Sequence, residues 1–365
     1  MANPTEPSTT QLVLGQLHQV QDPLFGKDIV SLQMVRNLEV SEDGRVSFTV
    51  VLPTPAHPHK GKIQQACETA LYELPFVTGV ELRFGAEVLD DRRSGGALAP
   101  SVRNTIAVAS GKGGVGKSTV AANLALALAQ QGALTGMLDL DVYGPSIPLM
   151  LGVRQIPRAR EGKIMPVRHH GLKIMSMGFL VEEEAPVIWR GPMMHQAIEQ
   201  MLRDVAWGNL DYLIIDLPPG TGDAQISLCQ SVSISGAIMV TTPQDVALAD
   251  VVKGIAMFRD LNVPVLGVVE NMSYYQCPHC GEAAYLFGQG GGRRVSQRMG
   301  VDFLAEIPLD IAVREGGDTG RPVVVQAPES PAGLALIKLS QVAAARLAVM
   351  NRDKPIPITP LLRTN

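Results

Sequence analysis

The stretch GKGGVGKS at residues 111–118 decides the fold predicted for this chain. It fits the spacing G-x-x-x-x-G-K-[ST] of a phosphate-binding loop, whose glycines let backbone N–H groups turn inward around an anion. The apolar run Thr105–Ala109 before it predicts a buried strand, and Val120–Gln131 after it predicts a helix that ends at Gly132. A glycine-rich turn that matches by chance would lack this strand and helix. The stretch therefore predicts that the chain binds a nucleoside triphosphate.

The residues of this loop have distinct expected roles. Lys117 can reach the outer phosphates and take part in catalysis, and the Ser118 hydroxyl can bind Mg²⁺ at the positive end of the helix. The residues expected to contact the nucleotide are Gly111, Lys112, Gly113, Gly114, Val115, Gly116, Lys117, Ser118 and Thr119.

Composition and charge limit the possible function classes. The chain has 365 residues, of which 46% are apolar and 18% charged, and this suggests a globular protein of two or three domains. Its net charge is −4 and it contains no basic block, so nucleic acid is not an expected partner. No apolar run approaches the roughly 18 residues of a membrane span, and four cysteines in so long a chain do not form a disulfide framework. We therefore expect a cytoplasmic protein without a membrane segment.

Hydrophobic periodicity divides the chain into two folded parts joined by a linker. The expected boundaries are a disordered tail at residues 1–9, a small α+β domain at 10–88, a linker at 89–103, a larger domain at 104–350 and a C-terminal tail at 351–365. In the small domain we expect helices at Thr10–Gln19 and Lys62–Leu74, a hairpin of Met34–Val40 and Arg45–Leu52, and a strand at Gly79–Phe84.

In the larger domain, apolar strand-like runs alternate with helical stretches. This alternation is typical of parallel β-α units, whose sheet is covered by helices on both faces. We therefore expect an α/β fold, a P-loop NTPase with a mainly parallel sheet, beside the small α+β N-terminal domain. The expected strands are Thr105–Ala109, Leu134–Leu138, Tyr212–Ile215, Gly236–Thr241, Val265–Val269 and Phe303–Ile307, and the expected last helix is Ala332–Met350.

Acidic residues follow two of these strands. Asp216 ends the run LIID, where a carboxylate can orient Mg²⁺ through water, and the loop Pro218–Gly222 after it can sense the γ-phosphate. In LDLDVYGPS, Asp141 is the candidate for orienting the attacking water, and Asp139 is expected to be buried nearer the strand end. A strand-end cap is the alternative role for Asp216, and a structural lysine–aspartate pair is the alternative role for Asp141.

The segment CPHCG at residues 277–281 carries the second set of candidate ligands, Cys277 and Cys280. A thioredoxin-type redox pair normally opens a helix early in its fold, whereas this pair follows a late strand. A zinc ribbon or an iron–sulfur cluster needs four ligands, and the chain has no second CxxC motif. A symmetric dimer would bring two such pairs together into one four-thiolate site.

Through its extra lysine, Lys112, the loop also resembles the deviant phosphate loop of the Mrp, ParA, MinD and nitrogenase iron-protein class. In that class the lysine reaches across a dimer to the partner's nucleotide, like an arginine finger, which is worth roughly 10³–10⁵ in rate. A solvated loop lysine is the alternative. The resemblance implies a homodimer in which Lys112 is catalytic, and the cysteine pair requires the same symmetry.

From about residue 103 to 350 the chain resembles the Mrp/ApbC family of iron–sulfur cluster carrier ATPases. The resemblance implies an ATP-dependent homodimer that binds a [4Fe–4S] cluster through Cys277 and Cys280 and delivers it to apoproteins. It also implies that Asn271 hydrogen-bonds the purine, although an Asn at a strand end is commonly a turn residue. The matching segments are GKGGVGKST, DLDVYGPSIP, WRGPMM, IIDLPPGTGD, VENMSYYQCPHCG and residues 287–292.

Residues 10–84 resemble the small SufT/PaaD-like iron–sulfur-assembly domain that many bacterial members carry at the N-terminus. Where that domain usually has a cysteine, this chain has His57, in the turn TPAHP at residues 54–58. We interpret His57 as part of a partner-docking surface rather than as a metal ligand.

The leading hypothesis is therefore a cluster carrier whose nucleotide state controls the dimer. In this hypothesis, movement of the loop Asp216–Asp223 after hydrolysis loosens the cluster site. The expected partners are a second copy of the chain, an upstream cluster scaffold and apoprotein recipients. Two alternatives remain, a positioning ATPase of the ParA/MinD kind and a nucleotide-dependent regulator with a structural zinc. A positioning ATPase requires a basic surface or helix, and the last expected helix offers only Lys338 and Arg346.

Overall fold

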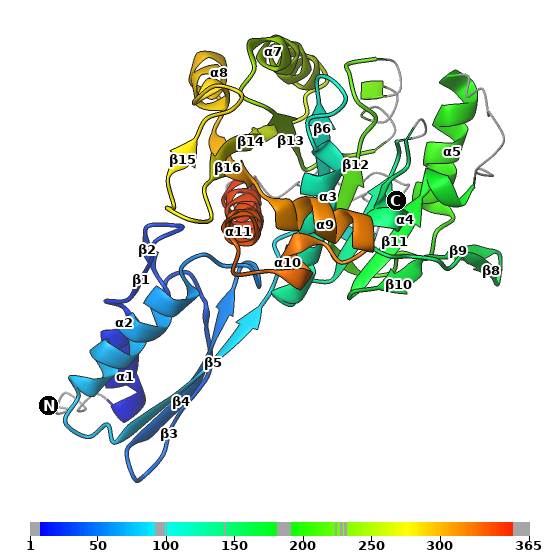
Figure 1. Cartoon of the computed structure of the whole chain (residues 1–365). Coiled ribbons are helices and arrows are strands. Elements are labelled where there is room, and N and C mark those ends of the chain that lie inside the picture. Colours follow the sequence, from blue (N-terminus) through cyan, green and yellow to red (C-terminus); the bar gives the residue numbers. More distant parts are fainter. Residues whose placement is uncertain are drawn as a thin grey trace, which may run out of the picture.

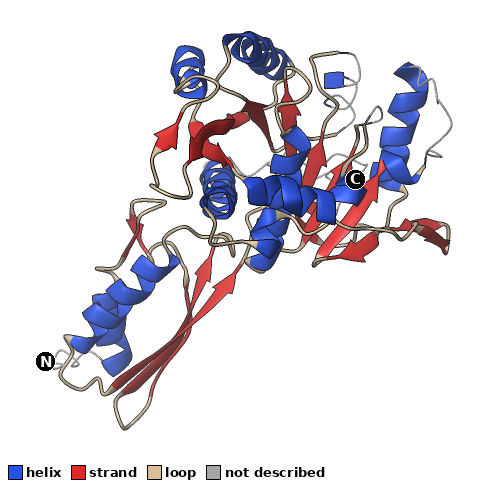
Figure 2. Cartoon of the chain, in the orientation of Figure 1, coloured by secondary structure: helices blue, strands red, loops and turns tan. Residues whose placement is uncertain are grey.

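The computed structural model describes residues 8–91, 99, 101–141, 144–180, 191–222, 225–226, 229 and 232–352. It shows a small N-terminal domain beside a larger domain built around one sheet (Figure 1, Figure 2). Most of the expected tails and linker, at residues 1–7, 92–98, 100 and 353–365, lie outside the described residues, as does Asp223.

The N-terminal domain packs two helices against one face of a three-stranded sheet (Figure 2). The central strand alternates buried and more exposed residues, as a strand with one covered face does. The expected helices, hairpin and strand are confirmed, with ends shifted by a few residues. The elements are α1 (Thr9–Leu17), β1 (Gln21–Asp22), β2 (Lys27–Asp28), β3 (Val35–Val40), β4 (Arg45–Leu52), α2 (Lys60–Tyr72) and β5 (Gly79–Ala86).

The larger domain is organised by a nine-stranded sheet in the order β10-β11-β7-β12-β6-β13-β14-β15, with β16 paired to β14. All its pairings are parallel except β10 with β11 and β14 with β15, so the expected mainly parallel sheet is confirmed. The strands are β6 (Val102–Ser110), β7 (Thr135–Asp139), β10 (Val167–His169), β11 (Leu172–Ser176), β12 (Leu210–Asp216), β13 (Gly236–Thr241), β14 (Val265–Gln276), β15 (Ala283–Ala284) and β16 (Phe303–Leu309), and β8 (Arg158–Arg160) pairs with β9 (Lys163–Met165) in a separate ribbon.

Helices cover both faces of this sheet. In the central strand β6, Ile106 and Val108 pack in the hydrophobic cluster that contains α3 and α11, whereas Ala107 and Ala109 pack in the cluster that contains α5 and α7. The helices are α3 (Lys117–Gln130), α4 (Ile147–Met150), α5 (Gly191–Arg203), α7 (Asp245–Asp260), α8 (Gly291–Met299), α9 (Ile311–Thr319), α10 (Val323–Gln326) and α11 (Pro331–Arg352), with a 3₁₀ turn at Met177–Phe179.

Three expected boundaries are corrected. Strand β14 does not end near Asn271 but continues to Gln276, because it pairs there with β15. Strand β6 begins at Val102, inside the expected linker, and α11 ends at Arg352, inside the expected tail. Helix α11 is long and apolar enough to cross a membrane by those two measures, but half of its most apolar window is buried within the fold. It therefore serves as a core helix of the larger domain.

The N-terminal domain contacts the larger domain through the turn that contains His57. The Tyr212 hydroxyl on β12 donates a hydrogen bond to Thr54 Oγ1 at 2.9 Å, and both residues are buried. Ala56 in the same turn belongs to the hydrophobic cluster of α3 and α11. Elsewhere at this junction, the Arg352 guanidinium lies 4.7 Å from the ring centroid of Phe25.

Candidate functional site

The phosphate loop joins β6 to α3, which begins at Lys117. Gly116 precedes the helix with φ +81°, a conformation that favours glycine. A Cβ at this position would lie 2.2 Å from Asn271 Nδ2, so the loop has no room for a side chain there. The loop is thus shaped to leave backbone N–H groups and the start of α3 free for an anion.

Lys117 lies at the centre of the charges brought together by the fold. Its ammonium is buried, 2.6 Å from Asp216 Oδ1 and 3.6 Å from Asp141 Oδ2, and it donates a hydrogen bond to Ser118 Oγ at 3.2 Å. The lysine–aspartate pair considered from the sequence is therefore present, with Asp216 as the closer partner. The structure places all four of these predicted site residues within one cluster.

Asp216 is suited to a metal-bound water. Its side chain is buried at the end of β12, and its Oδ2 atom has no hydrogen-bond partner within the part of the chain that the structure describes. Burial raises the pKa of Asp216, while Lys117 acts in the opposite direction. Because an unsatisfied buried oxygen is costly, a ligand at this position would stabilise the site. The Asp216 and Ser118 oxygens therefore fit Mg²⁺ and its water shell.

Asp139 is buried near the strand end, as expected, and shapes the loop that follows β7. Its carboxylate accepts hydrogen bonds from Ser176 Oγ at 2.9 Å and from the backbone N–H groups of Asp141 at 3.1 Å and Ile147 at 3.3 Å. Burial, together with the negative charge of Asp216, raises the pKa of Asp139 to about 7. Asp139 thus helps to position Asp141.

Lys112 differs from Lys117 because no carboxylate among the described residues holds its ammonium. Its backbone carbonyl accepts a hydrogen bond from Ser110 Oγ at 2.9 Å. Its side chain is only partly buried, and the described part of the chain gives its ammonium no ion pair. The cation is therefore available to solvent or to a second molecule.

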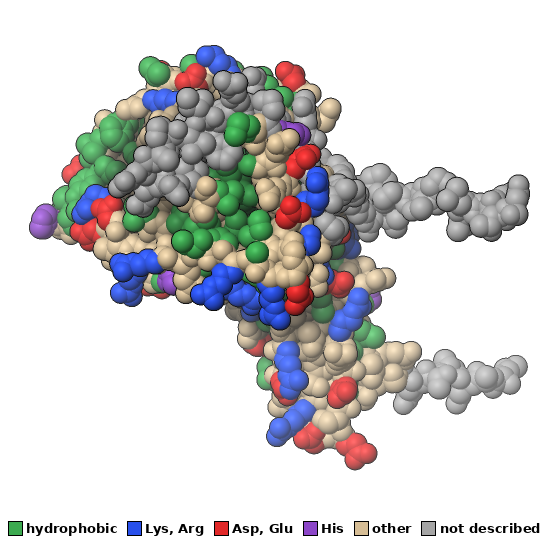
Figure 3. All heavy atoms as spheres, turned by 90° about the vertical axis from the view of Figure 1, so that its right-hand side faces the viewer, with side chains coloured by type: hydrophobic (Ala, Val, Ile, Leu, Met, Phe, Trp, Pro, Cys, Tyr) green, Lys and Arg blue, Asp and Glu red, His purple; other side chains and the backbone are tan. Residues whose placement is uncertain are grey.

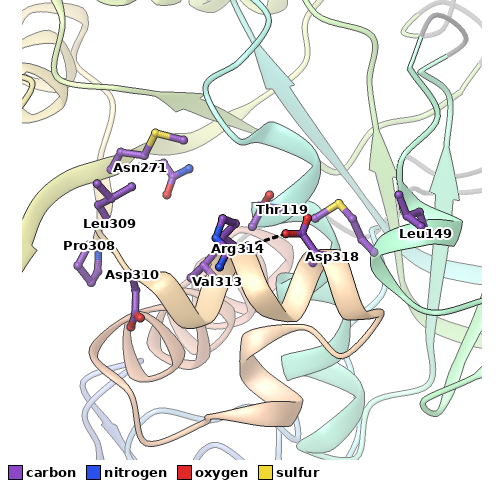
Figure 4. Close-up of a pocket in the computed structure, with 12 residues that line it drawn as sticks. Thr119, Leu149, Asn271, Pro308, Leu309, Asp310, Val313, Arg314 and Asp318 are labelled. Atoms are coloured by element: carbon purple, nitrogen blue, oxygen red, sulfur yellow. Dashed lines mark hydrogen bonds and ion pairs between the residues drawn. The ribbon is translucent and has the colours of Figure 1, made fainter.

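A cavity of about 330 Å³ lies beside the phosphate loop, between β14, α9 and the start of α3 (Figure 4). Asn271 is buried on its wall, and its Nδ2 donates a hydrogen bond to the Val115 carbonyl at 2.9 Å. Across the cavity, Arg314 and Asp318 form an ion pair of 2.9 Å. The size and position suit a purine base attached to phosphates in the loop.

The sequence did not identify most of this wall. Its lining includes Met272, Pro308, Leu309, Asp310, Val313 and Arg314. These residues come from the middle of β14, from the end of β16 with the residue after it, and from α9, and no local motif marks them. The carboxyl end of a late parallel strand was the available signal, since ligands bind at that edge of such sheets.

Cys277 and Cys280 lie at the tip of the hairpin that joins β14 to β15. The Cys277 N–H donates to the Glu282 carbonyl at 2.9 Å, and the Gly281 N–H donates to the Cys277 carbonyl at 2.8 Å, which closes the turn. Cys280 is exposed and Cys277 is half-buried, and both are free thiols. The backbone N–H groups of Cys280 and His279 lower the pKa of the Cys277 thiol. The hairpin therefore presents a pair of accessible thiols.

The hairpin alone is an incomplete metal site. Among the described residues, no group of three or more His, Cys, Asp or Glu side chains could hold a metal ion. Cys67 and Cys229 are separate from the hairpin, and burial raises the pKa of each to about 12. The pair also does not open a helix, unlike a thioredoxin-type redox pair. Two ligands per chain match half of a four-thiolate site.

The expected role of His57 in a partner-docking surface is wrong, since its side chain is fully buried. Its Nε2 lies 3.4 Å from Asp22 Oδ2, and its Nδ1 accepts a hydrogen bond from the His59 N–H at 3.2 Å. The turn around it instead packs against the protein's own larger domain. His57 is therefore not part of a surface that an external partner can reach.

The loop, the Lys117–Asp216 cluster and the parallel sheet define a P-loop nucleotide-binding protein with an added thiol hairpin. A profile of the family described as "NUBPL iron-transfer P-loop NTPase" matches residues 101–344, and a profile described as "Iron-sulfur cluster assembly protein" matches residues 10–82. The chain belongs to the family of NUBPL iron-transfer P-loop NTPases.

Two bacterial relatives align with nearly the whole chain, and a mouse relative aligns with two thirds of it. It is 49% identical over 352 residues to the "Iron-sulfur cluster carrier protein" of Synechocystis, covering 93% of this chain and 98% of the relative. It is 47% identical to the protein of that name in Deinococcus radiodurans, covering 92% and 95%. The mouse "Iron-sulfur cluster transfer protein NUBPL" is 52% identical over 249 residues, covering 67% and 78%.

Solved structures resemble the larger domain. An ADP complex of a nucleotide-binding protein from Archaeoglobus fulgidus aligns with a TM-score of 0.56 and 42% identity, covering 63% of this chain and 90% of that one. The septum site-determining protein MinD from Pyrococcus horikoshii, complexed with Mg-ADP, aligns with a TM-score of 0.50 and 27% identity, covering 65% and 94%.

Proposed function

We propose that this protein is an iron–sulfur cluster carrier that binds a cluster through Cys277 and Cys280 of two subunits and transfers it to apoproteins, with ATP binding and hydrolysis. The observation that carries the proposal is the accessible thiol pair on a hairpin of a P-loop domain. The names of the Synechocystis and Deinococcus relatives support the same cargo. Four thiolates from two chains suit a [4Fe–4S] cluster.

ATP is the proposed nucleotide, and the Lys117 cluster has the groups its chemistry needs. Lys117 is held by Asp216 and Asp141 within reach of the loop, so arriving phosphates compete with these carboxylates for its ammonium. Ser118 and Asp216 would hold Mg²⁺, which would supply positive charge at the outer phosphate oxygens. Asp141 is then free to accept a hydrogen bond from the attacking water.

A homodimer is proposed because each chain offers two incomplete sites. The ammonium of Lys112 lacks an ion pair in the described part of its chain, and the hairpin has two thiols where a cluster takes four. The side of the molecule that carries α4 and α5 exposes hydrophobic groups in its centre (Figure 3), and Leu149 of α4 is 70% exposed beside the nucleotide cavity. Exposed apolar surface of this kind commonly marks an interface.

The remaining assignments are part of the same proposal. The loop Pro218–Gly222 is a γ-phosphate sensor, and the N-terminal domain at residues 10–88 assists exchange with an upstream scaffold or with apoproteins. We place the protein in the cytoplasm, where thiols stay reduced. The end of β5 at Ala86 and the start of β6 at Val102 support a small domain that ends near residue 88 and a larger domain that begins near residue 102.

The test is anaerobic reconstitution with iron and sulfide of the wild type and of a Cys277→Ala, Cys280→Ala double variant. Iron and sulfide per dimer, together with absorbance near 400 nm (roughly where thiolate-bound clusters absorb), should be present in the wild type and lost in the variant. A colourless wild type that binds one zinc per dimer would reject the cluster. A monomer with a full complement of iron and sulfide would reject the shared site.

Nucleotide dependence is tested separately with Lys117→Ala. The variant should lose hydrolysis by a factor of roughly 10²–10³, as expected when one charge-stabilising group is removed, and should slow cluster transfer to an apoprotein. Undiminished transfer would show that the cargo moves without the ATPase.

A further inference from the structure

The nucleotide cavity and the cysteine hairpin share one wall. A second cavity, of about 370 Å³, lies against Cys277, Tyr275 and Pro278 on the hairpin. Its lining includes Pro308, Leu309 and Asp310, and the same three residues line the nucleotide cavity. The end of β16 and Asp310, the residue before α9, therefore line both cavities.

Strand β14 connects the same two places along the backbone. Asn271 holds the phosphate loop through the Val115 carbonyl, and Cys277 follows six positions later on the same chain segment. The pairing of β14 with β13 ends at Glu270 and Thr241. Beyond that point β14 is held by its short pairings with β16 and β15. The last part of β14 is therefore an arm that projects from the sheet.

A bulge lies where this arm begins. Between the pairs Asn271–Ile307 and Tyr275–Leu309, three residues of β14 face the single residue Pro308. Proline has no N–H to donate to the ladder, which accounts for the interruption. Met272 in this bulge has φ +54°, an uncommon conformation for a residue other than glycine. Bulges re-aim the strand that follows them.

The bulge is held by a buried pair that the proposed catalysis does not use. Ser273 Oγ donates a hydrogen bond to Glu270 Oε1 at 2.6 Å, and both side chains are buried. The other oxygen of Glu270 accepts the Gly292 N–H at 2.5 Å, at the start of α8. Glu270 is thereby fixed to α8, and Ser273 ties the bulge to it.

We propose that the Met272–Tyr274 bulge transmits occupancy of the nucleotide cavity to the cysteine hairpin, with Ser273 as the positioning residue that sets the bulge. This rests on the proposed function, since it takes the cavity to be a nucleotide site. A base in the cavity would contact Met272, which lies in the bulge, and Leu309, which lies at the end of β16. Leu309 pairs with Tyr275, which follows the bulge and lies two residues before Cys277. Filling the cavity restrains both partners and so restrains the arm.

The test measures alkylation of Cys277 in the cluster-free, full-length protein with and without saturating ADP. ADP fills the base cavity but brings no γ-phosphate, so a clamp that requires γ-phosphate does not contribute. In the wild type, ADP should slow alkylation of Cys277 by roughly fivefold, the lower end of the usual range for coupled sites. The quantity compared is the ratio of the Cys277 alkylation rate without ADP to the rate with ADP. In Ser273→Ala this ratio should fall to about one, while ADP binding measured by calorimetry persists.

Matched variants separate this role from a general loss of packing. Ser296→Ala removes another buried serine hydroxyl, which bonds to the Gly292 carbonyl at 2.9 Å in α8, and it should keep the wild-type ratio. Ser273→Thr retains a hydroxyl and should restore the ratio. Hydrogen exchange on the wild type requires no substitution: ADP should slow exchange at residues 275–277.

The outcomes distinguish the two proposals. Failure of the wild type to bind ADP would reject the proposed nucleotide function. ADP binding with no change in alkylation or exchange at the hairpin would overturn the transmission through the bulge and leave the nucleotide function standing. An undiminished ratio in Ser273→Ala would likewise overturn the role of Ser273.

Discussion

Two turns that resemble each other in sequence have opposite surroundings in the structure. The turn TPAHP of the N-terminal domain and the hairpin CPHCG of the larger domain each place a potential metal ligand next to proline. His57 in the first is fully buried against Asp22, and its turn packs on the larger domain. Cys277 and Cys280 in the second lie on a projecting arm. A ligand type therefore indicates exchange of a cargo only where the fold leaves it accessible.

The largest expected effect is the difference in reactivity between the hairpin thiols and the thiols of Cys67 and Cys229. A thiol with pKa of about 12, as burial gives Cys67 and Cys229, is ionised to roughly one part in 10⁵ at pH 7. Cys277 has a lowered pKa, so its alkylation should begin at lower pH than that of an ordinary thiol. Native protein at pH 7 should take up label at Cys277 and Cys280 before the other two, as read by peptide mass spectrometry. Rapid labelling of Cys67 would contradict the buried N-terminal core.

The second prediction compares the free energy of unfolding and the bound iron in variants of His57 and of the hairpin cysteines. His57→Ala should lower the free energy of unfolding by about 2–4 kcal/mol, because it leaves a cavity and removes the partner of a buried carboxylate. It should leave iron bound per folded dimer unchanged, whereas the Cys277→Ala, Cys280→Ala variant should lose the iron with little change in stability. Denaturant unfolding and iron analysis measure the two effects. His59→Ala, at a partly exposed site, is the matched control and should cost under about 0.5 kcal/mol.

Loss of cluster in His57→Ala, measured on protein that remains folded, would contradict the difference drawn between the two turns. It would show that the N-terminal turn takes part in holding the cargo despite its burial.

The smallest expected effect is at the domain junction. Tyr212→Phe removes the hydroxyl that donates to Thr54 and should cost about 1 kcal/mol, the usual net value of a hydrogen bond. ATP hydrolysis should stay at the wild-type rate, because the ring still fills its place beside β6. A large loss of hydrolysis would mean that the N-terminal domain acts on the nucleotide site through this contact.

Much of the fold could be predicted because its signals are local. The strand before the phosphate loop, the helix after it and the alternating apolar runs are patterns of neighbouring residues, and the parallel sheet followed from them. The extension of β14 to Gln276 could not be predicted in this way. It depends on pairing with β15 across the cysteine turn, and a run such as NMSYYQ has no clear strand period.

By itself, the sequence determined the phosphate loop, the thiol pair and the positions of the main strands along the chain, because each depends on residues close together in the chain. Only the tertiary structure decided that Lys117 meets Asp216, 99 positions away, and that His57 is buried. It also decided that Pro308 and Leu309 at the end of β16, with Asp310 before α9, form a wall common to two cavities. Burial and distance arise from packing between remote segments, and no local pattern of residues records them.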